Sequence, residues 1–364
     1  MKHCSKCILP ENFQNISFDE KGVCNFCNNY RKYVPKGEDL LIAEFEKAKA
    51  KKRPYDALVP ISGGKDSTYI LYLAKKKYGL NVLTFTYDNG FFSDIALENI
   101  KTMVDKLNVD HIFFHHNWEL QKKMYRTALI NSGEICGVCG LGINGITLKL
   151  AADWKIPIIL LGHTPLEDNS FSQEKIYDYY RMNKILKDSG ISDKEIKRFL
   201  IYPKLTYFSV FFKSKTGAFA RQINPLFYIE NPSDKEMSEI LKKEMYWKDK
   251  SGAEYSKHFD CLAEPFSNFV REYRFGYSRR ISQLSTMVRK KEISREEAKK
   301  IHQNDKLAKK PENFELICER LSLSSDDVKD ILNVKPFKYK KYISKSNKLF
   351  SKLKSLKDKI KKSS

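Results

Sequence analysis

The sequence has no long hydrophobic run. No apolar segment approaches the roughly 20 residues that a helix needs to cross a bilayer. The N-terminus, Met1 to Cys4, also lacks the apolar core of a secretory signal, so we expect a cytoplasmic protein. Hydrophobic residues still make up 41% of the 364 positions, which excludes a wholly disordered chain and predicts a core large enough for more than one domain.

Arginine is scarce in a chain that is otherwise strongly basic. The formal net charge is +21, but only 13 residues are Arg against 53 Lys. Twelve of the lysines and a single acidic residue, Asp358, lie between residues 335 and 364, so this tail alone contributes +11. Phosphate and base recognition often favours the Arg fork. The composition therefore predicts no specific nucleic-acid partner.

The lysine-rich tail carries one apolar pattern. Leu349, Leu353, Leu356 and Ile360 recur at the spacing of one helical face. Folded as a helix, the tail would present a basic amphipathic surface suited to weak contact with an anionic membrane. A solvated, frayed terminus is the alternative, because isolated helices of this length are marginal.

Strand-like and helical patterns alternate through the middle of the chain. Apolar runs at 55–61, 82–87, 111–114 and 157–161 are separated by amphipathic segments such as 67–77 and 95–107. This alternation predicts an α/β fold, in which right-handed crossovers build a parallel sheet covered by helices. The expected regions are a cysteine-rich lobe at 1–40, the α/β domain at 41–230, a helical region at 231–310 and the tail at 311–364.

A glycine-containing turn follows the first predicted strand and leads into a helical run. Its six residues are Ser62, Gly63, Gly64, Lys65, Asp66 and Ser67. Glycines let the backbone approach an anion, and a helix N-terminus directs unpaired N–H groups toward it, so the turn predicts a phosphate site. It lacks the Gly-x4-Gly-Lys-Ser/Thr spacing of a Walker A loop. The turn instead resembles the pyrophosphate loop of the PP-loop (adenine nucleotide alpha hydrolase-like) ATP pyrophosphatases.

The resemblance implies that the chain cleaves ATP between its α and β phosphates and adenylates a substrate oxygen. The loop would hold the pyrophosphate, with Mg²⁺, and Lys65, Asp66 and Ser67 would take part in catalysis. The second predicted strand ends at Asp88, which would contact ribose or Mg²⁺, although an Asn-Gly turn there also needs no function. Gly162, after the last predicted strand, resembles the Gly-His loop of tRNA-modifying PP-loop enzymes and would belong to the nucleotide site.

Eight cysteines are numerous for a reducing compartment, where thiols serve as ligands or reactive groups rather than as disulfides. Two Cys-x2-Cys pairs, separated by sixteen residues, comprise Cys4, Cys7, Cys24 and Cys27. This spacing predicts one tetrahedral Zn²⁺ site in a zinc-ribbon lobe. Such a closed site is structural, because the metal supplies folding energy to a lobe with little core. Reduced thiols without a metal are the alternative.

A third Cys-x2-Cys pair, Cys136 and Cys139, supplies only two ligands. A third thiolate would have to come from Cys261 or Cys318. Some PP-loop tRNA thiolases carry such a pair at a comparable place and hold an iron–sulfur cluster with a third, distant cysteine. By this resemblance the pair would bind a second metal or a cluster. A redox or substrate contact and a glycine-flanked structural turn are the other interpretations.

The C-terminal region contains several distinctive segments. They are Trp-Lys at 247–248, the pair Lys257 and His258, Phe-Gly at 275–276 followed by Arg279 and Arg280, and Ser-Arg-Glu-Glu-Ala at 294–298. The four basic residues form a set suited to an anionic substrate, or else a solvated helix surface. Together with the cysteine-rich lobe and the phosphate loop, these segments resemble the N-acetyl sugar amidotransferase family of the WbpG and PseA type, over about residues 1–300.

That resemblance implies an ATP-dependent amidotransferase of bacterial surface-glycan biosynthesis, acting on a lipopolysaccharide O-antigen or a flagellin glycan. The N-acetyl group of a nucleotide-activated or related sugar would become an acetamidino group, with ammonia replacing the activated oxygen. The sequence shows no glutaminase elbow, since the Gly-x-Cys-x-Gly pattern is incomplete at 137–141. Ammonia would therefore come from a glutaminase subunit through a barrel-type channel subunit, as in imidazole glycerol phosphate synthase.

Two other functions explain parts of the sequence. A tRNA-modifying PP-loop enzyme, either a thiolase or a lysidine synthetase, would account for the cysteines and the positive charge, but would be expected to carry an RNA-binding appendage. A zinc-ribbon nucleic-acid adaptor would leave the phosphate loop unexplained. The C-terminal segments favour the amidotransferase.

Overall fold

The computed structural model describes residues 2–164, 176–201, 212, 220–249, 260–277, 279–304 and 310–335. Within these residues, five parallel strands form one sheet in the order β3-β2-β1-β4-β5. The strands are β1 Ala57–Pro60, β2 Val82–Asp88, β3 Asp110–His115, β4 Ile158–Leu160 and β5 Arg221–Ile223. The predicted α/β class and parallel sheet are confirmed.

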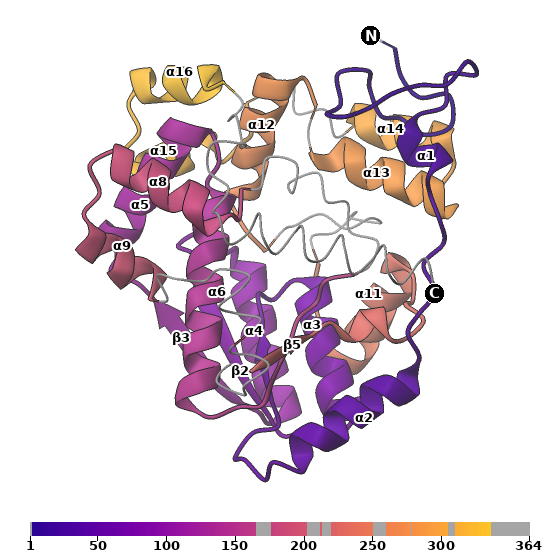
Figure 1. Ribbon diagram of the computed structural model, residues 1–364, viewed down its shortest axis with the longest axis vertical. Coiled ribbons are helices and arrows are strands. Elements are labelled where there is room, and N and C mark those ends of the chain that lie inside the picture. The colour runs from indigo at the N-terminus through magenta and orange to yellow at the C-terminus, as the bar shows by residue number, and fades with distance from the viewer. Residues whose placement is uncertain are drawn as a thin grey trace.

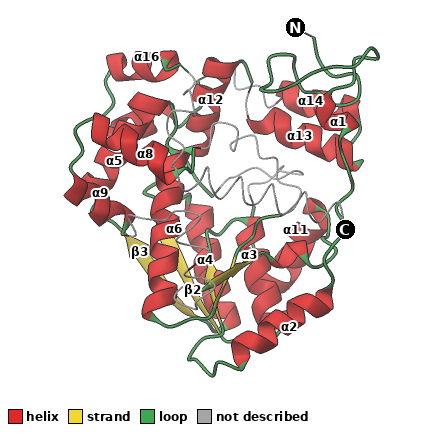
Figure 2. Cartoon of the chain, in the orientation of Figure 1, coloured by secondary structure: helices red, strands yellow, loops and turns green. Residues whose placement is uncertain are grey.

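Helices surround this sheet. Along the chain they are α1 Asn25–Asn28, α2 Glu38–Lys49, α3 Lys65–Tyr72, the π-turn η1 Leu73–Lys77, α4 Asp94–Leu107, α5 Trp118–Ser132, α6 Cys136–Asp153, α8 Tyr179–Asp188, α9 Asp193–Leu200, the 3₁₀ turn η2 Pro225–Phe227, α11 Asp234–Met245, α12 Glu264–Phe275, α13 Arg279–Lys290, α14 Arg295–Asn304, α15 Phe314–Leu321 and α16 Ser325–Asn333. The strands gather in the lower part of the view in Figure 2. Helices α12 to α16 lie in its upper part, beyond the sheet (Figure 1). In the ranges described, no helix combines the length and the hydropathy of a membrane span.

The central strand β1 is buried on both faces. Leu58 packs in one hydrophobic core with Phe85 of β2 and Ile146 of α6. Ala57 and Val59 belong to the opposite core, which includes α2, α3, α4 and α11. Because successive side chains of a strand point to opposite faces, this short strand separates the two layers.

The edge strand β5 was not predicted from the sequence. It pairs with β4, from Ile158 opposite Arg221 to Leu160 opposite Ile223. Of its three residues only Ile223 is buried. A strand this short, with a single apolar residue facing the core, shows no hydrophobic run for a sequence pattern to reveal.

The segment expected to belong to the tail begins with two packed helices. Phe314, Ile317 and Leu321 of α15 and Ile331 of α16 lie in a hydrophobic core with α5 and α12. The predicted boundary at residue 311 therefore differs from the structure, where packed helices continue to Asn333. Their apolar residues recur at helical spacing, a pattern obscured by the lysine content that follows. The expected amphipathic seam at 349–360 lies outside the described residues.

The cysteine-rich lobe and the helical region share one core. Leu9 and Phe13 of the lobe are buried with Ile281 and Leu284 of α13. The ring centroids of Phe13 and of Tyr277, which lies between α12 and α13, are 4.8 Å apart. The lobe therefore packs on the C-terminal helices, as the position of α1 beside α13 and α14 also shows (Figure 1).

Candidate functional site

The predicted phosphate loop connects the end of β1 to the first turn of α3. The hydroxyl of Ser67 accepts a hydrogen bond from the Ser62 N–H at 3.1 Å and donates to the Gly64 carbonyl, also at 3.1 Å. Thr68 Oγ1 donates to the same carbonyl at 2.6 Å. These bonds close the loop on itself at the carboxyl edge of the sheet. The structure thus brings the loop residues together at a helix N-terminus, where the dipole and free N–H groups favour an anion.

Two glycines of the site lie in close packing with neighbouring backbone. Gly63 has a φ of 75°, and a Cβ atom there would lie 2.2 Å from the carbonyl oxygen of Ala96, in the first turn of α4. A Cβ atom on Gly162 would lie 3.3 Å from the backbone of Asp66. Gly162 is therefore next to the phosphate loop, and any side chain at this position would press on Asp66.

Lys65 is held by two carboxylates. Its ammonium group pairs with Asp234 in the first turn of α11 and lies 3.6 Å from Asp66 Oδ1. The side chain is only 8% exposed. This arrangement ties the start of α3 to α11 and neutralises the lysine. A direct role of Lys65 in catalysis stays a prediction.

Asp88 lies at the end of β2, on the same edge of the sheet. Its Oδ1 atom accepts a hydrogen bond from the Gly90 N–H at 2.8 Å, and its carbonyl accepts one from Gln121 Nε2 at 3.0 Å. The carboxylate therefore shapes the Asn-Gly turn, which is the structural role that the sequence also allowed. Its contact with ATP or Mg²⁺ stays a prediction.

Three residues that the sequence did not connect with the loop contact it. Trp247 Nε1 and Asn99 Nδ2 both donate to the Gly63 carbonyl, at 2.9 and 3.1 Å. A Cβ atom on Gly64 would lie 3.2 Å from Asp260 Oδ2, so this carboxylate rests against the loop. The Trp-Lys segment was distinctive in the sequence, and Asn99 is a polar residue on the buried face of α4. Neither sequence feature indicates that its residue binds the Gly63 carbonyl.

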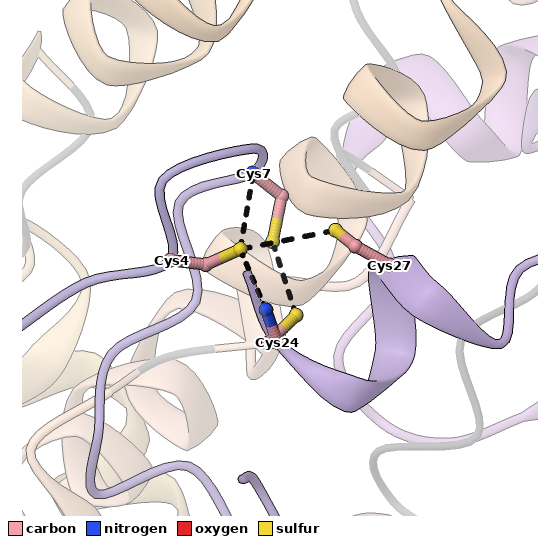
Figure 3. Close-up of side chains that lie close together, drawn as sticks. All are labelled: Cys4, Cys7, Cys24 and Cys27. Atoms are coloured by element: carbon pink, nitrogen blue, oxygen red, sulfur yellow. Dashed lines mark hydrogen bonds between the residues drawn. The ribbon is translucent and has the colours of Figure 1, made fainter. Parts of the chain in front are cut away.

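The four N-terminal cysteines form a compact cluster (Figure 3). Their Sγ atoms lie within 4.8 Å of one another, with 3.9 Å between Cys4 and Cys27 and 3.8 Å between Cys7 and Cys24. A tetrahedral ion with metal–sulfur bonds of about 2.3 Å needs sulfur atoms about 3.8 Å apart. All four residues are buried. The spacing and burial therefore suit a metal or iron–sulfur site, and the identity of its ligands stays a prediction.

Neutral and ionised thiols compete inside this cluster. Hydrogen bonds with Cys24 and Cys27 hold the pKa of Cys7 far below its usual range. The hydrogen bond with Cys24 raises the pKa of Cys27 well above its usual range. One thiolate is therefore stabilised at the expense of its neighbour. A bound cation resolves this competition, because metal ligation needs the thiolate form.

Two arginines of the C-terminal helices hold the cysteine-rich lobe. The guanidinium of Arg295 donates to the carbonyls of Cys4, at 2.8 Å, and Cys7, at 2.9 Å. Arg289 Nη1 lies 3.9 Å from Cys7 Sγ. The Ser-Arg-Glu-Glu-Ala segment, which contains Arg295, thus secures the metal site.

Cys136, Cys139 and Cys261 come together near the end of β2. Cys261 interacts electrostatically with the other two thiols, and its Sγ accepts a hydrogen bond from Asn89 Nδ2 at 3.4 Å. Burial raises the pKa of Cys136 to about 12 and that of Cys139 to about 11. Among the residues described, only the N-terminal cysteines form a group of ligand atoms within 4.8 Å, so these three thiols are more widely spaced. Of the two expected third cysteines, Cys261 is the one that interacts electrostatically with both thiols of the pair.

The predicted substrate-binding residues are described only in part. Lys257 and His258 lie outside the described residues. Arg279, at the start of α13, interacts electrostatically with Cys136. Arg280 is 9% exposed and packs inside the helical layer. Arg280 is thus buried and does not share an exposed surface with Arg279, and Arg279 interacts electrostatically with the second cysteine pair.

Comparisons with known proteins agree with this architecture. Residues 232–357 match the family model described as LPS biosynthesis protein WbpG-like, C-terminal domain. Residues 56–138 match the model for queuosine biosynthesis protein QueC, a PP-loop family. The expected resemblance is confirmed in both parts of the chain. The match to the WbpG-like domain continues to residue 357, so the resemblance extends beyond the expected limit at about residue 300.

Individual relatives are distant. Uncharacterized protein MJ1599 of Methanocaldococcus jannaschii is 25% identical over 167 residues, which span 44% of this chain and 58% of that relative. U34-tRNA thiolase NcsA from Methanococcus maripaludis, solved with its 4Fe–4S cluster, has a TM-score of 0.37 at 16% identity, covering 92% of this chain and 96% of that one. NMN synthetase from Francisella tularensis has a TM-score of 0.36 at 15% identity, covering 75% and 96%.

Proposed function

We propose that this chain, in which a WbpG-like C-terminal domain follows a PP-loop ATP pyrophosphatase domain, is an ATP-dependent sugar amidotransferase. Its substrate is an acetamido sugar, nucleotide-activated or related, and its product carries an acetamidino group in place of the N-acetyl group. The observation that supports this proposal is the direct contact of the C-terminal domain with the phosphate loop, through Trp247 and Asp260. A substrate held by that domain would lie next to the site of ATP cleavage.

The reaction has two steps. The amide oxygen of the sugar attacks the α-phosphorus of ATP, pyrophosphate leaves, and the amide becomes an O-adenylated imidate. Ammonia then adds to the imidate carbon and loses a proton, and the bond between carbon and the AMP oxygen breaks. Ser62, Gly64 and Ser67 would bind the departing pyrophosphate at the N-terminus of α3, where N–H groups stabilise the developing charge. Activation is needed because an amide oxygen is a poor leaving group, whereas AMP is a good one.

Asp260 and Asp66 are the carboxylates that would hold Mg²⁺. The Asp260 carboxylate rests against Gly64, and its carbonyl accepts a hydrogen bond from the Ser93 N–H at 3.2 Å, which fixes the residue beside the loop. A carboxylate at an anion site repels phosphate unless a cation lies between them. Mg²⁺ suits this position because it binds one or two carboxylates together with phosphate oxygens. When bound, it would neutralise charge on the pyrophosphate.

We assign Zn²⁺ to the four-cysteine site. Four buried thiols at tetrahedral spacing leave no open position for a substrate or water, which is typical of structural zinc. Its role would be to hold the N-terminal lobe on α13 and α14.

Ammonia is the proposed nucleophile and would come from other subunits. The sequence contains no glutaminase elbow, so a glutaminase subunit and a barrel-type channel subunit would deliver the ammonia. The product would be a precursor of a bacterial surface glycan, either lipopolysaccharide O-antigen or flagellin glycan, made in the cytoplasm.

A PP-loop tRNA-modifying enzyme of the thiolase type is the alternative, and Cys136, Cys139 and Cys261 favour it. These thiols lie together without forming a compact site for one ion. A polynuclear iron–sulfur cluster distributes its ligands over several irons and suits this wider spacing better than a single metal ion. A cluster or second metal here would place sulfur chemistry next to the nucleotide site.

Mass spectrometry separates the two functions. UDP- and CMP-linked acetamido sugars are incubated with the protein, ATP, Mg²⁺ and ammonium, and AMP is measured in parallel. We expect one sugar to lose about 1 Da as AMP forms, because NH replaces O. A gain of about 16 Da on tRNA in the presence of sulfide, with every sugar unchanged, would establish the thiolase instead.

A further inference from the structure

The carbonyl of Gly63 accepts two buried hydrogen bonds from outside the phosphate loop. Trp247 Nε1 donates at 2.9 Å and Asn99 Nδ2 at 3.1 Å. Trp247 is 4% exposed and Asn99 only 1%, so water does not compete for this carbonyl. Asn99 belongs to α4, whereas Trp247 follows α11 and belongs to the WbpG-like domain. Two separate parts of the chain therefore hold one atom of the loop.

Asn99 also fixes the backbone next to Trp247. Its Nδ2 atom donates to the Lys248 carbonyl at 2.8 Å, and its Oδ1 atom accepts from the Lys248 N–H at 2.8 Å. The side-chain amide thus uses its donor and acceptor on one residue of the C-terminal domain. These two hydrogen bonds anchor the backbone segment that carries the indole.

The orientation of the Gly63 carbonyl determines where the next N–H points. A peptide unit is planar and trans, so its C=O and N–H groups point in opposite directions. With the carbonyl bound to Trp247 and Asn99, the Gly64 N–H points toward Ser62 Oγ, at 3.4 Å, inside the loop. A reversed peptide would present its carbonyl to the anion instead. Glycine allows such a reversal at little steric cost, so the orientation has to be held by other residues.

We propose that Trp247 and Asn99 are positioning residues for ATP, because they hold the Gly63–Gly64 peptide with its N–H toward Ser62 Oγ, inside the loop that would bind the pyrophosphate. ATP affinity then depends on the docking of the C-terminal domain through Trp247. This inference rests on one part of the proposed function, pyrophosphate binding by the loop, and is independent of the acceptor that is adenylated.

Trp247→Phe tests the proposal in the full-length protein. The substitution keeps an aromatic ring in the core and removes the N–H donor together with part of the indole volume, and the AMP measurement reports the effect of the lost packing. Isothermal titration with Mg²⁺ and ATP, in the absence of sugar, should show a Kd about 5- to 15-fold higher than that of the unsubstituted protein. AMP lacks the pyrophosphate and should bind both proteins equally. The matched control is Trp154→Phe, since Trp154 packs on Tyr55 and has no bond to the loop; its ATP affinity should be unchanged.

A second variant keeps the proposal testable if Trp247→Phe is unstable. Asn99→Leu keeps the branched shape of the side chain, removes the second donor together with both bonds to Lys248, and retains the indole N–H of Trp247. It should also weaken ATP binding without changing AMP binding. Because both donors act on one carbonyl, the double variant should lose less affinity than the sum of the single losses.

Several results would overturn the proposal. One is an unchanged ATP Kd in folded Trp247→Phe and Asn99→Leu proteins. Another is an equal loss of ATP and AMP affinity, which would assign Trp247 to core packing alone. Failure of the sugar assay would contradict the amidotransferase and leave these binding results as they are, so the two failures are distinguishable.

Discussion

Arg295 donates hydrogen bonds from Nε and Nη2 to the carbonyl of Cys4, 291 residues earlier in the chain. The same guanidinium reaches the Cys7 carbonyl, so one side chain spans both ends of the first cysteine knuckle. The N-terminal metal lobe and the WbpG-like domain are therefore joined by a contact that depends on the planar fork of arginine.

Arg295→Lys should loosen the metal lobe. A lysine ammonium is a single charged point and cannot bond both carbonyls in the geometry of the guanidinium. We expect zinc release to a chromogenic chelator to be about 5- to 10-fold faster, with ATP binding unchanged. Arg53→Lys, at an exposed position, is the matched control. Equal release rates in the two variants would show that Arg295 does not hold the lobe.

Removal of one metal ligand should lower the stability of the protein more than Arg295→Lys does. We expect one tightly bound zinc ion per chain, measured by elemental analysis, and Cys24→Ser should abolish it. The melting temperature should fall by about 10 °C or more, because the lobe takes folding energy from the metal. Cys318→Ala, which removes a buried cysteine from α15, should retain the zinc. A well-folded Cys24→Ser protein with a full zinc content would contradict the assignment of the ligands.

Substitutions in the phosphate loop should remove activity without unfolding the protein. Asp66 is partly exposed, and Ser67 supplies the hydroxyl that closes the loop. For both Asp66→Ala and Ser67→Ala we expect AMP formation to fall by about 100-fold or more, because the pyrophosphate would lose either the Mg²⁺ held by Asp66 or the hydroxyl of Ser67. Lys101→Ala on exposed α4 surface serves as control. Undiminished AMP release with a normal melting temperature would exclude the loop as the ATP site.

Stability should depend on pH through His116. Burial lowers the pKa of this side chain from 6.5 to about 4, and its ring stacks on Phe199 with 4.6 Å between centroids. The unfolded chain therefore binds the proton more tightly than the folded one. The stabilisation is complete above pH 6.5 and is lost as the pH falls toward 4, by at most about 3 kcal/mol.

Urea unfolding at several pH values tests this expectation. His116→Gln should flatten the fall in the free energy of unfolding between pH 6.5 and pH 4. His3→Gln, at an exposed position, should keep the slope of the unsubstituted protein. Identical slopes in the two variants would show that another group causes the acid sensitivity.

The phosphate loop and the cysteine knuckles could be predicted because their signals are local. Ser62 to Ser67 form one turn, and their residue types indicate an anion-binding loop. Each cysteine knuckle brings two ligands together within four residues. Only the approach of one knuckle to the other depends on the fold. The sixteen residues between them form a short loop, which keeps the two knuckles close.

The contacts of the C-terminal domain with the loop could not be predicted in this way. Trp247 and Asp260 meet Gly63 and Gly64 across long sequence separations, and no periodic pattern encodes such a pairing. The same reason applies to Cys261, where two candidate partners for the Cys136 pair were equally open until the fold placed one of them. The sequence marks such residues as distinctive, but tertiary packing alone determines which residues they contact.

The cysteine-rich lobe is synthesised well before the helices that cover it. Leu9 and Phe13 are buried against Ile281 and Leu284, so these apolar side chains have no cover while the ribosome is making the intervening chain. A zinc ion bound early would keep the lobe in shape through this interval. A shortage of zinc during growth should therefore appear first as aggregation of nascent chains, before any loss of activity in protein that is already complete.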